Sequence, residues 1–346
     1  METVKKMSLV PTILKWVGIV LGGLVVLVGL ILLLAHLLTP VFYHGFFKDA
    51  KQEYLIPGLS DGFIPQGFDY LEEEEIYLQC GYMKDNSASR IYILPEGREE
   101  TDAGYVLLQT EDGKAYTGHT GGITSDGTRV WLANDGEGTD NCVWSFLLSD
   151  LLALENGGTL TLKDRFYPES RSAYCMVDGE YLWVGEFYRA EDYPTKSSHG
   201  HIMKDGTPHN ALICAYRLND AYSCGVMEEK PEKLLSVTGQ VQGMARTEDG
   251  GFVLSTSYGL STSHLLFYTD VTKEAPDAGM MIGNDLVNVW YLDAEAQVRD
   301  LKLPPMSEEP VIRDGRLYVL TESASQKYLF GNFTRGRHVY SVPVEE

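Results

Sequence analysis

A short pattern that recurs five times constrains the fold of this chain more than any other feature. Each copy has an apolar segment, a turn, and a second apolar segment rich in β-branched and aromatic residues; four copies carry Asp-Gly at the turn. Asp-Gly is a strong hairpin signal, because glycine tolerates the positive φ that tight hairpin turns require. The copies read PQGFDYLEEEEIYLQCGY, TGGITSDGTRVWLAND, YCMVDGEYLWVGEFY, QGMARTEDGGFVLSTSYG and EPVIRDGRLYVLTESAS.

Further strand-like segments follow each hairpin, as expected if each copy begins a four-stranded unit. Third strands are expected at 90–94, 142–146, 213–218, 289–293 and 338–344, and fourth strands at 105–110, 160–166, 233–238 and 298–303. Four antiparallel strands repeated about every 50–70 residues are typical of a β-propeller blade. Residues 263–286 fit two assignments in the fourth unit: a long loop before its third strand, or that third strand itself.

The last unit stops at its third strand, and the chain offers a replacement for the fourth before the first unit. The segment EYLIPGL, residues 53–59, could join the last blade, close the ring and remove an exposed sheet edge. The sequence therefore predicts an all-β fold, a five-bladed β-propeller over residues 53–346 in which an N-terminal strand closes the last blade.

A continuous apolar segment from Trp16 to Leu38 lies before the propeller. A helix of this length, at about 1.5 Å per residue, spans the roughly 30 Å hydrocarbon core of a bilayer. A secretory signal peptide is the alternative, but its apolar region is usually about 7–15 residues long and ends at a small-x-small cleavage site. We therefore expect a single transmembrane anchor at 16–38, between a basic cytoplasmic tail at 1–15 and a tether at 39–52.

The distribution of charge predicts where the propeller lies. Lys5, Lys6 and Lys15 precede the apolar segment, whereas only Lys48 and Lys51 follow it closely. Because the more basic flank of a membrane helix stays in the cytoplasm, we expect an extracytoplasmic, cell-envelope propeller on a single-pass anchor. The formal net charge of −21 excludes nucleic acid as a natural partner, since its phosphates would be repelled.

The propeller geometry gathers polar residues at one face. The innermost strand of each blade starts beside the central channel and the second strand returns to that face, so residues entering the first and leaving the second converge on a central mouth. Convergent polar groups in a concave site are the default binding-site hypothesis. The predicted ligand-binding residues are Gln66, His119, Tyr174, Tyr188, Gln242, Ser257, Tyr258, Glu309 and Glu322.

Two further expectations concern the mouth. Glycines 67, 121, 122 and 243 are expected where the five inner strands crowd the axis. The strand next to the tether should run from the opposite face towards the mouth, so we expect the mouth to point away from the membrane. A purely structural explanation of the polar ring stays open, because polar residues in a wet channel also bind water and backbone groups.

Two functions fit this mouth. In the first, which we favour, it binds a polar ligand of the envelope, such as a glycan or peptide, or a partner protein. In the second, the chain is a hydrolase or cyclotransferase acting on a glycan or peptide, with two of Asp135, Glu186, Glu309 and Glu322 as acid and base and His119 as proton relay. A divalent metal held by His119 and Glu309 would assist that chemistry. The sequence contains no nucleophile motif that would decide for an enzyme.

Two smaller features leave alternatives open. His199, His201 and His209 lie in a long loop of the third unit, where a solvated mobile loop is favoured over a transition-metal site. Cys214 and Cys224 could face each other across a hairpin, and an exported location permits a disulfide without requiring one.

Several segments also resemble known propellers. IPQG, HTGGI, VQGM, STSYG and ESAS are similar to segments of uncharacterised secreted or membrane-anchored five-bladed propellers of Gram-positive bacteria, over residues 54–340. This resemblance implies the fold and a shared mouth. PQGF and SASRIYIL more distantly resemble glutaminyl cyclases of the plant and bacterial type, which are also five-bladed. Their EGWGL segment is VQGMA here and their NELE motif is absent, so only the architecture is implied.

Overall fold

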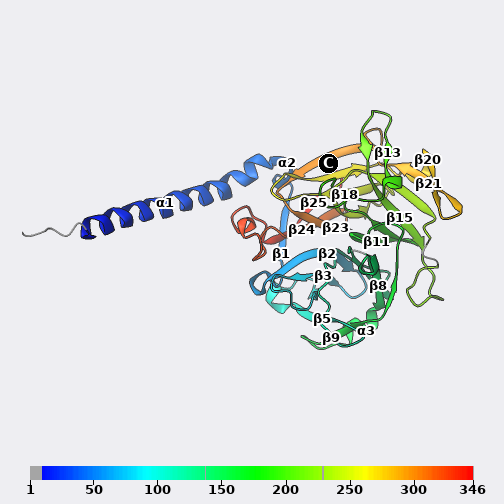
Figure 1. Cartoon of the computed structure of the whole chain (residues 1–346), viewed down its shortest axis with the longest axis horizontal. Coiled ribbons are helices and arrows are strands. Elements are labelled where there is room, and N and C mark those ends of the chain that lie inside the picture. The colour runs from blue at the N-terminus through cyan, green and yellow to red at the C-terminus, as the bar shows by residue number, and fades with distance from the viewer. Residues whose placement is uncertain (1–9, 137, 228–229, 346) are drawn as a thin grey trace, which may run out of the picture.

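The computed structural model describes residues 10–136, 138–227 and 230–345, and in these residues five blade sheets surround a central channel (Figure 1). The all-β, five-bladed prediction is confirmed. Residues 1–9, which include most of the expected basic tail, lie outside the described residues.

An N-terminal strand closes the fifth blade, as predicted. The sheet order is β1 (Lys51–Leu55), β25 (His338–Pro343), β24 (Arg316–Thr321) and β23 (Ser307–Arg313). Lys51 pairs with Ser341 and Leu55 with His338, so β1 runs towards the mouth. The strand is shorter than the expected 53–59, because the chain leaves the sheet after Leu55 and turns through η1 (Leu59–Asp61) into the first blade.

The first two blades share an exchanged strand. Blade one contains β2 (Phe63–Leu71), β3 (Ile76–Met83), β4 (Arg90–Pro95) and β5 (Gly104–Thr110); blade two contains β6 (Gly122–Ser125), β7 (Arg129–Asn134), β8 (Cys142–Leu147) and β10 (Asp164–Phe166). The expected fourth strand at 160–166 is divided. Its first half, β9 (Thr159–Leu162), follows helix α3 (Leu148–Leu152) and pairs in parallel with β5 of blade one, and only β10 joins blade two.

Blades three and four resolve the ambiguous segment. Blade three contains β11 (Tyr174–Asp178), β12 (Tyr181–Gly185), β15 (Ala211–Arg217) and β16 (Lys233–Val237), extended by β21 (Asp285–Tyr291) and β20 (Ala278–Ile282); blade four contains β17 (Val241–Arg246), β18 (Phe252–Thr256), β19 (Ser263–Tyr268) and β22 (Gln297–Leu303). The prediction that residues 289–293 form the third strand of blade four was wrong. β19 takes that place, and β21 instead pairs in parallel with β16 at the outer edge of blade three.

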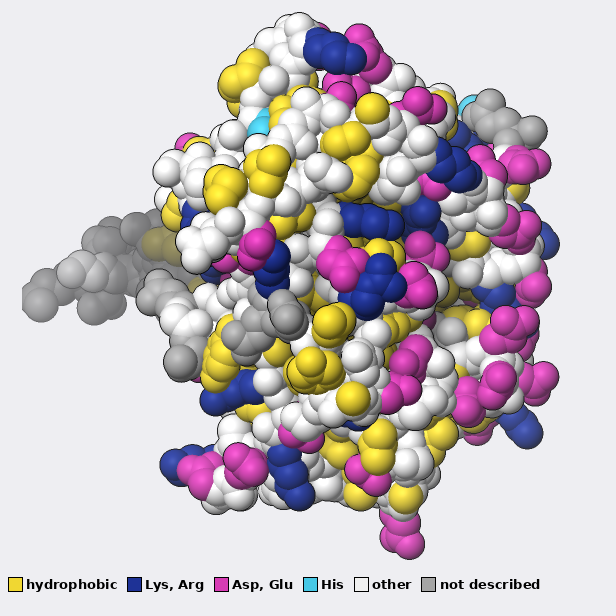
Figure 2. All heavy atoms as spheres, turned by 90° about the vertical axis from the view of Figure 1, so that its right-hand side faces the viewer, with side chains coloured by type: hydrophobic (Ala, Val, Ile, Leu, Met, Phe, Trp, Pro, Cys, Tyr) yellow, Lys and Arg dark blue, Asp and Glu magenta, His cyan; other side chains and the backbone are white. Residues whose placement is uncertain are grey.

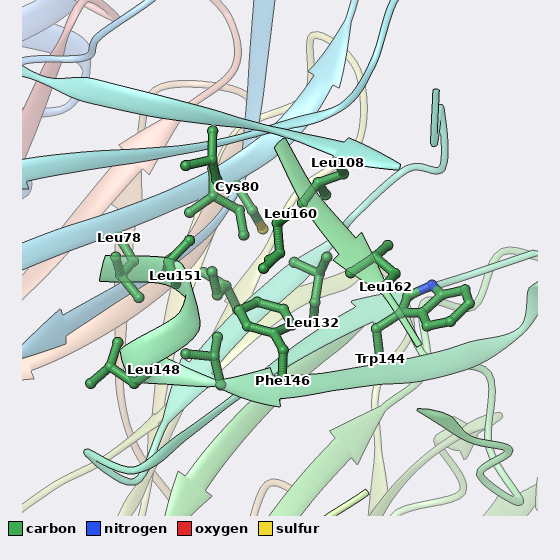
Figure 3. Close-up of a cluster of buried hydrophobic side chains, with 14 of the residues drawn as sticks. Leu78, Cys80, Leu108, Leu132, Trp144, Phe146, Leu148, Leu151, Leu160 and Leu162 are labelled. Atoms are coloured by element: carbon green, nitrogen blue, oxygen red, sulfur yellow. The ribbon is translucent and has the colours of Figure 1, made fainter. Parts of the chain in front are cut away.

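The core lies between neighbouring blades, as Figure 3 shows for blades one and two. Leu160 of the exchanged β9 packs there with Leu78, Leu108 and Leu132. The four glycines lie at crowded positions of the inner strands, as predicted. A Cβ on Gly67 would meet the backbone of Ile123 in the next blade, so close strand approach explains these glycines.

One long helix precedes the propeller. α1 (Val10–Phe42) is exposed along most of its length, and residues 13–42 are long and apolar enough to cross a membrane, a test that a signal sequence also passes. The expected tether is ordered: after α1, helix α2 (His44–Phe47) places Phe46 in the core between blades four and five, against Leu301 and Tyr340. All five cysteines are free, including Cys214 and Cys224.

Candidate functional site

A cavity of about 420 Å³ opens where the first strands begin and the second strands end. Residues from all five blades line it. Those predicted from the sequence as site residues are Gln66, His119, Asp135, Gln242, Ser257, Tyr258 and Glu322, and those not predicted include Arg171, Phe187, Tyr193, Glu308, Lys327 and Tyr328. Tyr82, at the end of the second strand of blade one, also lines the cavity, as the convergence of the strand ends predicts.

The inner-strand register decides which side chains reach this cavity. Gln66 and Gln242 are the extra residues of β-bulges in β2 and β17, and β23 has a comparable bulge between Ser307 and Pro310. A bulge adds one residue to one strand and re-aims its side chain. By this register the residue equivalent to Gln66 in the fifth blade is Glu308, and it is Glu308 that lines the mouth.

The prediction therefore chose the wrong residue in two strands, each time one position after the residue that lines the mouth. Tyr174 is fully buried, and Ala173 reaches the cavity instead. Glu309 does not line the mouth; its Oε2 accepts hydrogen bonds from the backbone N–H groups of Phe68 (2.8 Å) and Ile123 (3.0 Å). Glu309 thus joins the inner strands of blades one and two to blade five, and burial raises the pKa of its carboxyl group well above the usual value.

Two buried carboxyl groups of the fifth blade, Glu308 and Glu322, line the mouth close to one another. Glu322 accepts a hydrogen bond of 2.9 Å from Gln66 Nε2, and Glu308 accepts one of 3.3 Å from Gln242 Nε2. Burial raises the pKa of Glu322 to about 7, although the nearby Lys327 opposes the rise. Burial, with the charge of Glu322, raises the pKa of Glu308 well above its usual value. Near neutral pH, the pair therefore holds at least one proton.

His119 also lines the mouth. Its ring is open to the cavity and stacks on Tyr82, with the ring centroids 5.0 Å apart and the planes inclined by 29°. The protein surrounding this recess, together with the charge of Lys327, lowers the pKa of His119 to about 4, so its imidazole is neutral at physiological pH. Lys327 Nζ in turn donates a 2.6 Å hydrogen bond to the Tyr82 hydroxyl.

The rim of the mouth combines one ion pair with aromatic rings. Arg171 Nε lies 2.7 Å from Asp135 Oδ1. Phe187 packs edge-on against Tyr193 and lies 6.3 Å from the Tyr258 ring. Tyr188, which was predicted to bind ligand, does not line the cavity.

Glu186 holds a loop rather than lining the mouth. Its carboxylate is 1% exposed, lies 2.9 Å from Nδ1 of the fully buried His199 and accepts the backbone N–H groups of Arg171 and Leu212. The long loop of blade three, with η4 (Ser197–His199), β13 (His201–Ile202) and β14 (Pro208–His209), is therefore attached to the blade at its buried His199, while most of its other residues are exposed, as expected for a solvated loop.

No group of three His, Cys, Asp or Glu side chains that could hold a metal is found in the part of the chain that the structure describes. His119 lies in the mouth, whereas Glu309 binds backbone donors in the channel, so these two residues do not form a common site. The three histidines of the blade-three loop are also directed to separate partners: His199 to Glu186, His201 to the His199 carbonyl, and His209 to the Ser236 carbonyl.

A smaller cavity of about 280 Å³ lies at the opposite end of the channel and is lined by Asp69, Arg246 and Glu309, among others. Burial raises the pKa of Asp69 to about 7, and its carboxylate accepts backbone N–H groups of Tyr70 and Ser125. Asp69 and Glu309 thus bind backbone donors of the inner strands at this end of the channel.

Comparison with known proteins supports no assignment to a family. No known protein family matches the sequence, and no curated protein is similar to it. Among solved structures, Myxococcus xanthus glutaminyl cyclase is 7% identical with a TM-score of 0.42, covering 85% of this chain and 94% of that one. Alpha-L-arabinofuranosidase from Lactobacillus brevis is 12% identical with a TM-score of 0.44, covering 85% and 94%.

The tail fiber of Staphylococcus aureus phage P68 is 11% identical with a TM-score of 0.47, covering 89% of this chain and 56% of that chain. A glutaminyl cyclase is therefore among the similar structures, in line with the resemblance seen in the sequence. These similarities are too weak to carry an argument about function.

Proposed function

We propose that the mouth is a binding site for a neutral polar ligand, specifically a short glycan of the cell envelope. The observation that carries this proposal is the lining of the 420 Å³ cavity, which combines aromatic rings with polar groups from every blade. Its volume is within the range of about 300–1,000 Å³ that is usual for small-molecule sites.

The charges of the mouth are largely compensated within it. Asp135 is paired with Arg171, and Glu322 interacts with Gln66 and Lys327. Glu308 favours its protonated form. Neutral hydroxyl and amide groups can exchange hydrogen bonds with these side chains, whereas a strongly charged ligand would disrupt existing pairs.

Aromatic side chains complete the site. Tyr82, Phe187, Tyr193, Tyr258 and Tyr328 surround the cavity. Such rings offer a large apolar face with a polar edge, which suits the apolar faces of sugar rings.

Binding titrations with neutral envelope oligosaccharides, measured by calorimetry on the full-length protein, test this proposal. Tyr258→Ala should weaken binding at least about tenfold, since it removes a rim ring without opening the core. Tyr222→Ala is the matched control, because Tyr222 is an exposed tyrosine outside the mouth. Equal affinity of the two variants, or binding only of charged fragments, would refute the proposal.

A second candidate function is hydrolysis or cyclotransfer on a glycan or peptide. It is favoured by the Glu308–Glu322 pair, because two carboxyl groups with raised pKa values in one cavity can divide acid and base roles. Of the carboxylates first considered, Glu186 and Glu309 hold structural groups and Asp135 is paired with Arg171. Release of products from end-labelled oligosaccharides by the wild type, but not by Glu308→Gln, would establish this activity.

We also propose that α1 remains as an uncleaved anchor and that the propeller lies outside the cytoplasm. The apolar length of α1 and the lysines before it support this arrangement. Protease treatment of intact cells should digest the propeller and leave an N-terminal membrane fragment, whereas full protection or a soluble cleaved form would contradict it.

A further inference from the structure

Two loops at the mouth carry exposed apolar side chains that ligand binding does not explain. One loop, residues 257–262, joins β18 to β19, and the other, residues 322–337, joins β24 to β25. In each loop the two residues before a leucine line the mouth cavity, and the leucine itself points into solvent: Leu260 is 72% exposed and Leu329 is 54% exposed. Phe333, on the second loop, is 37% exposed.

Both loops contact the segment that follows the anchor helix. The Tyr43 hydroxyl lies 3.5 Å from Thr262 Oγ1 in the first loop, and the Arg335 guanidinium of the second lies 6.0 Å from the centre of the Phe47 ring. Figure 1 shows the second loop, in red, projecting from the ring on the side on which α1 leaves it.

Apart from the buried Glu322 at the start of the second loop, the same segments contain no acidic residue. The whole chain has 49 acidic residues, yet none occurs in 257–262, 323–337 or 38–47, and the second loop carries Lys327, Arg335 and Arg337. Mouth loops from other blades do carry carboxylates, such as Asp135 and Asp192. Figure 2, which views the side away from α1, shows acidic side chains spread over that surface.

We propose that Leu260, Leu329 and Phe333 form a lipid-contacting surface that rests in the interfacial region of the bilayer crossed by α1. This inference rests on the proposed anchor. Exposed apolar side chains gain free energy on leaving water, and basic residues are attracted to anionic headgroups that would repel carboxylates. The contacts of Thr262 and Arg335 with the post-anchor segment hold both loops beside the end of α1.

This surface reverses the orientation expected from the sequence. β1 does begin at the face opposite the mouth, where Arg316 binds the Asp49 carbonyl. However, α2 packs along the outside of β22 and Tyr43 lies beside a mouth loop, so α1 ends on the mouth side of the ring. The edge of the mouth then lies at the bilayer surface, within reach of a glycan that is attached to a lipid.

Site-specific fluorescence tests the proposal on the full-length protein in vesicles of phosphatidylcholine and phosphatidylglycerol. Single cysteines are placed at Leu329, Leu286 and Leu34 in a Cys224→Ser background, since the other four cysteines are buried. Leu286, on β21 at the outer edge of blade three, is the matched control because it is 69% exposed. Leu34, in α1, reports on the anchor.

After labelling with an environment-sensitive fluorophore, lipids with a nitroxide near the headgroup should quench Leu329→Cys at least about threefold more than Leu286→Cys. A deep nitroxide should quench Leu34→Cys. If the label at position 34 is quenched but the labels at positions 329 and 286 are quenched equally and weakly, the lipid-contacting surface is refuted and the anchor is still supported. If the label at position 34 is not quenched, the proposed anchor is refuted, and so is the lipid-contacting surface that depends on it.

Discussion

The side-chain amide of Gln66 lies 2.9 Å from the carboxylate of Glu322, across the junction between the first and last blades. The two residues belong to opposite ends of the propeller sequence, and β1 closes the ring that brings them together. The mouth is therefore complete only when the ring is closed, and its function depends on the same contacts as its stability.

Truncation of two neighbouring glutamates in β23 should have different effects, one on stability and the other on ligand binding. Glu309→Ala leaves the buried N–H groups of Phe68 and Ile123 without an acceptor and should reduce the free energy of unfolding by about 2–5 kcal/mol. Glu308→Ala should change stability little but abolish ligand binding, since Glu308 lines the mouth. Chemical denaturation and binding titration of both variants check this; the reverse pattern would show that the register of β23 is misassigned.

The stability of the protein should fall as the pH rises towards neutral, in part because of Glu322. Its pKa is raised to about 7 in the folded state, so the folded state binds more protons than the unfolded one between about pH 4.5 and 7. The contribution is fully present below pH 4.5 and is lost as the pH rises through 7. Glu322→Gln should remove this loss and be more stable than the wild type at pH 8 by about 1–3 kcal/mol.

Melting temperatures measured from pH 4 to pH 8 check the Glu322 prediction. The difference in melting temperature between the variant and the wild type should increase as the pH rises. A constant difference across this range would show that Glu322 titrates normally.

The exchanged N-terminal strand should contribute much of the stability of the ring. Tyr54 is buried, its ring centroid lies 5.0 Å from that of Tyr77 and its hydroxyl accepts a hydrogen bond from Gln79. Tyr54→Ala should therefore lower the free energy of unfolding by about 3–5 kcal/mol. Lys51→Ala in the same strand is the control and should cost less than about 0.5 kcal/mol, because Lys51 is exposed. Similar losses in the two variants would argue against strand closure.

Removal of the buried histidine should release the loop of blade three. His199→Ala eliminates the side-chain partner of the buried Glu186 carboxylate, and amide hydrogen exchange in residues 187–210 should accelerate by about tenfold or more. His201→Ala, which removes a half-buried ring from the same loop, should leave exchange nearly unchanged. Uniformly slow exchange in His199→Ala would mean that other contacts fix the loop.

The repeated hairpins were sufficient to predict five blades and the closing strand, because Asp-Gly turns and apolar alternation are local signals. The exchanges of β9 and β21 between blades were missed, since parallel pairing at a blade edge depends on distant partners. Gln66, His119 and Glu322 were placed correctly at the mouth. Tyr174 and Glu309 were not, because the register of each inner strand decides which residue reaches the mouth and no turn residue marks it.

High-resolution crystallography of the protein soaked with neutral envelope oligosaccharides tests the ligand-binding claim most directly. We predict density for a sugar in the mouth, in contact with Tyr82 or Tyr258 and within hydrogen-bond distance of Gln66 or Glu322. Density only in the opposite cavity beside Asp69 and Arg246, or a mouth that stays filled with water at saturating ligand, would contradict it.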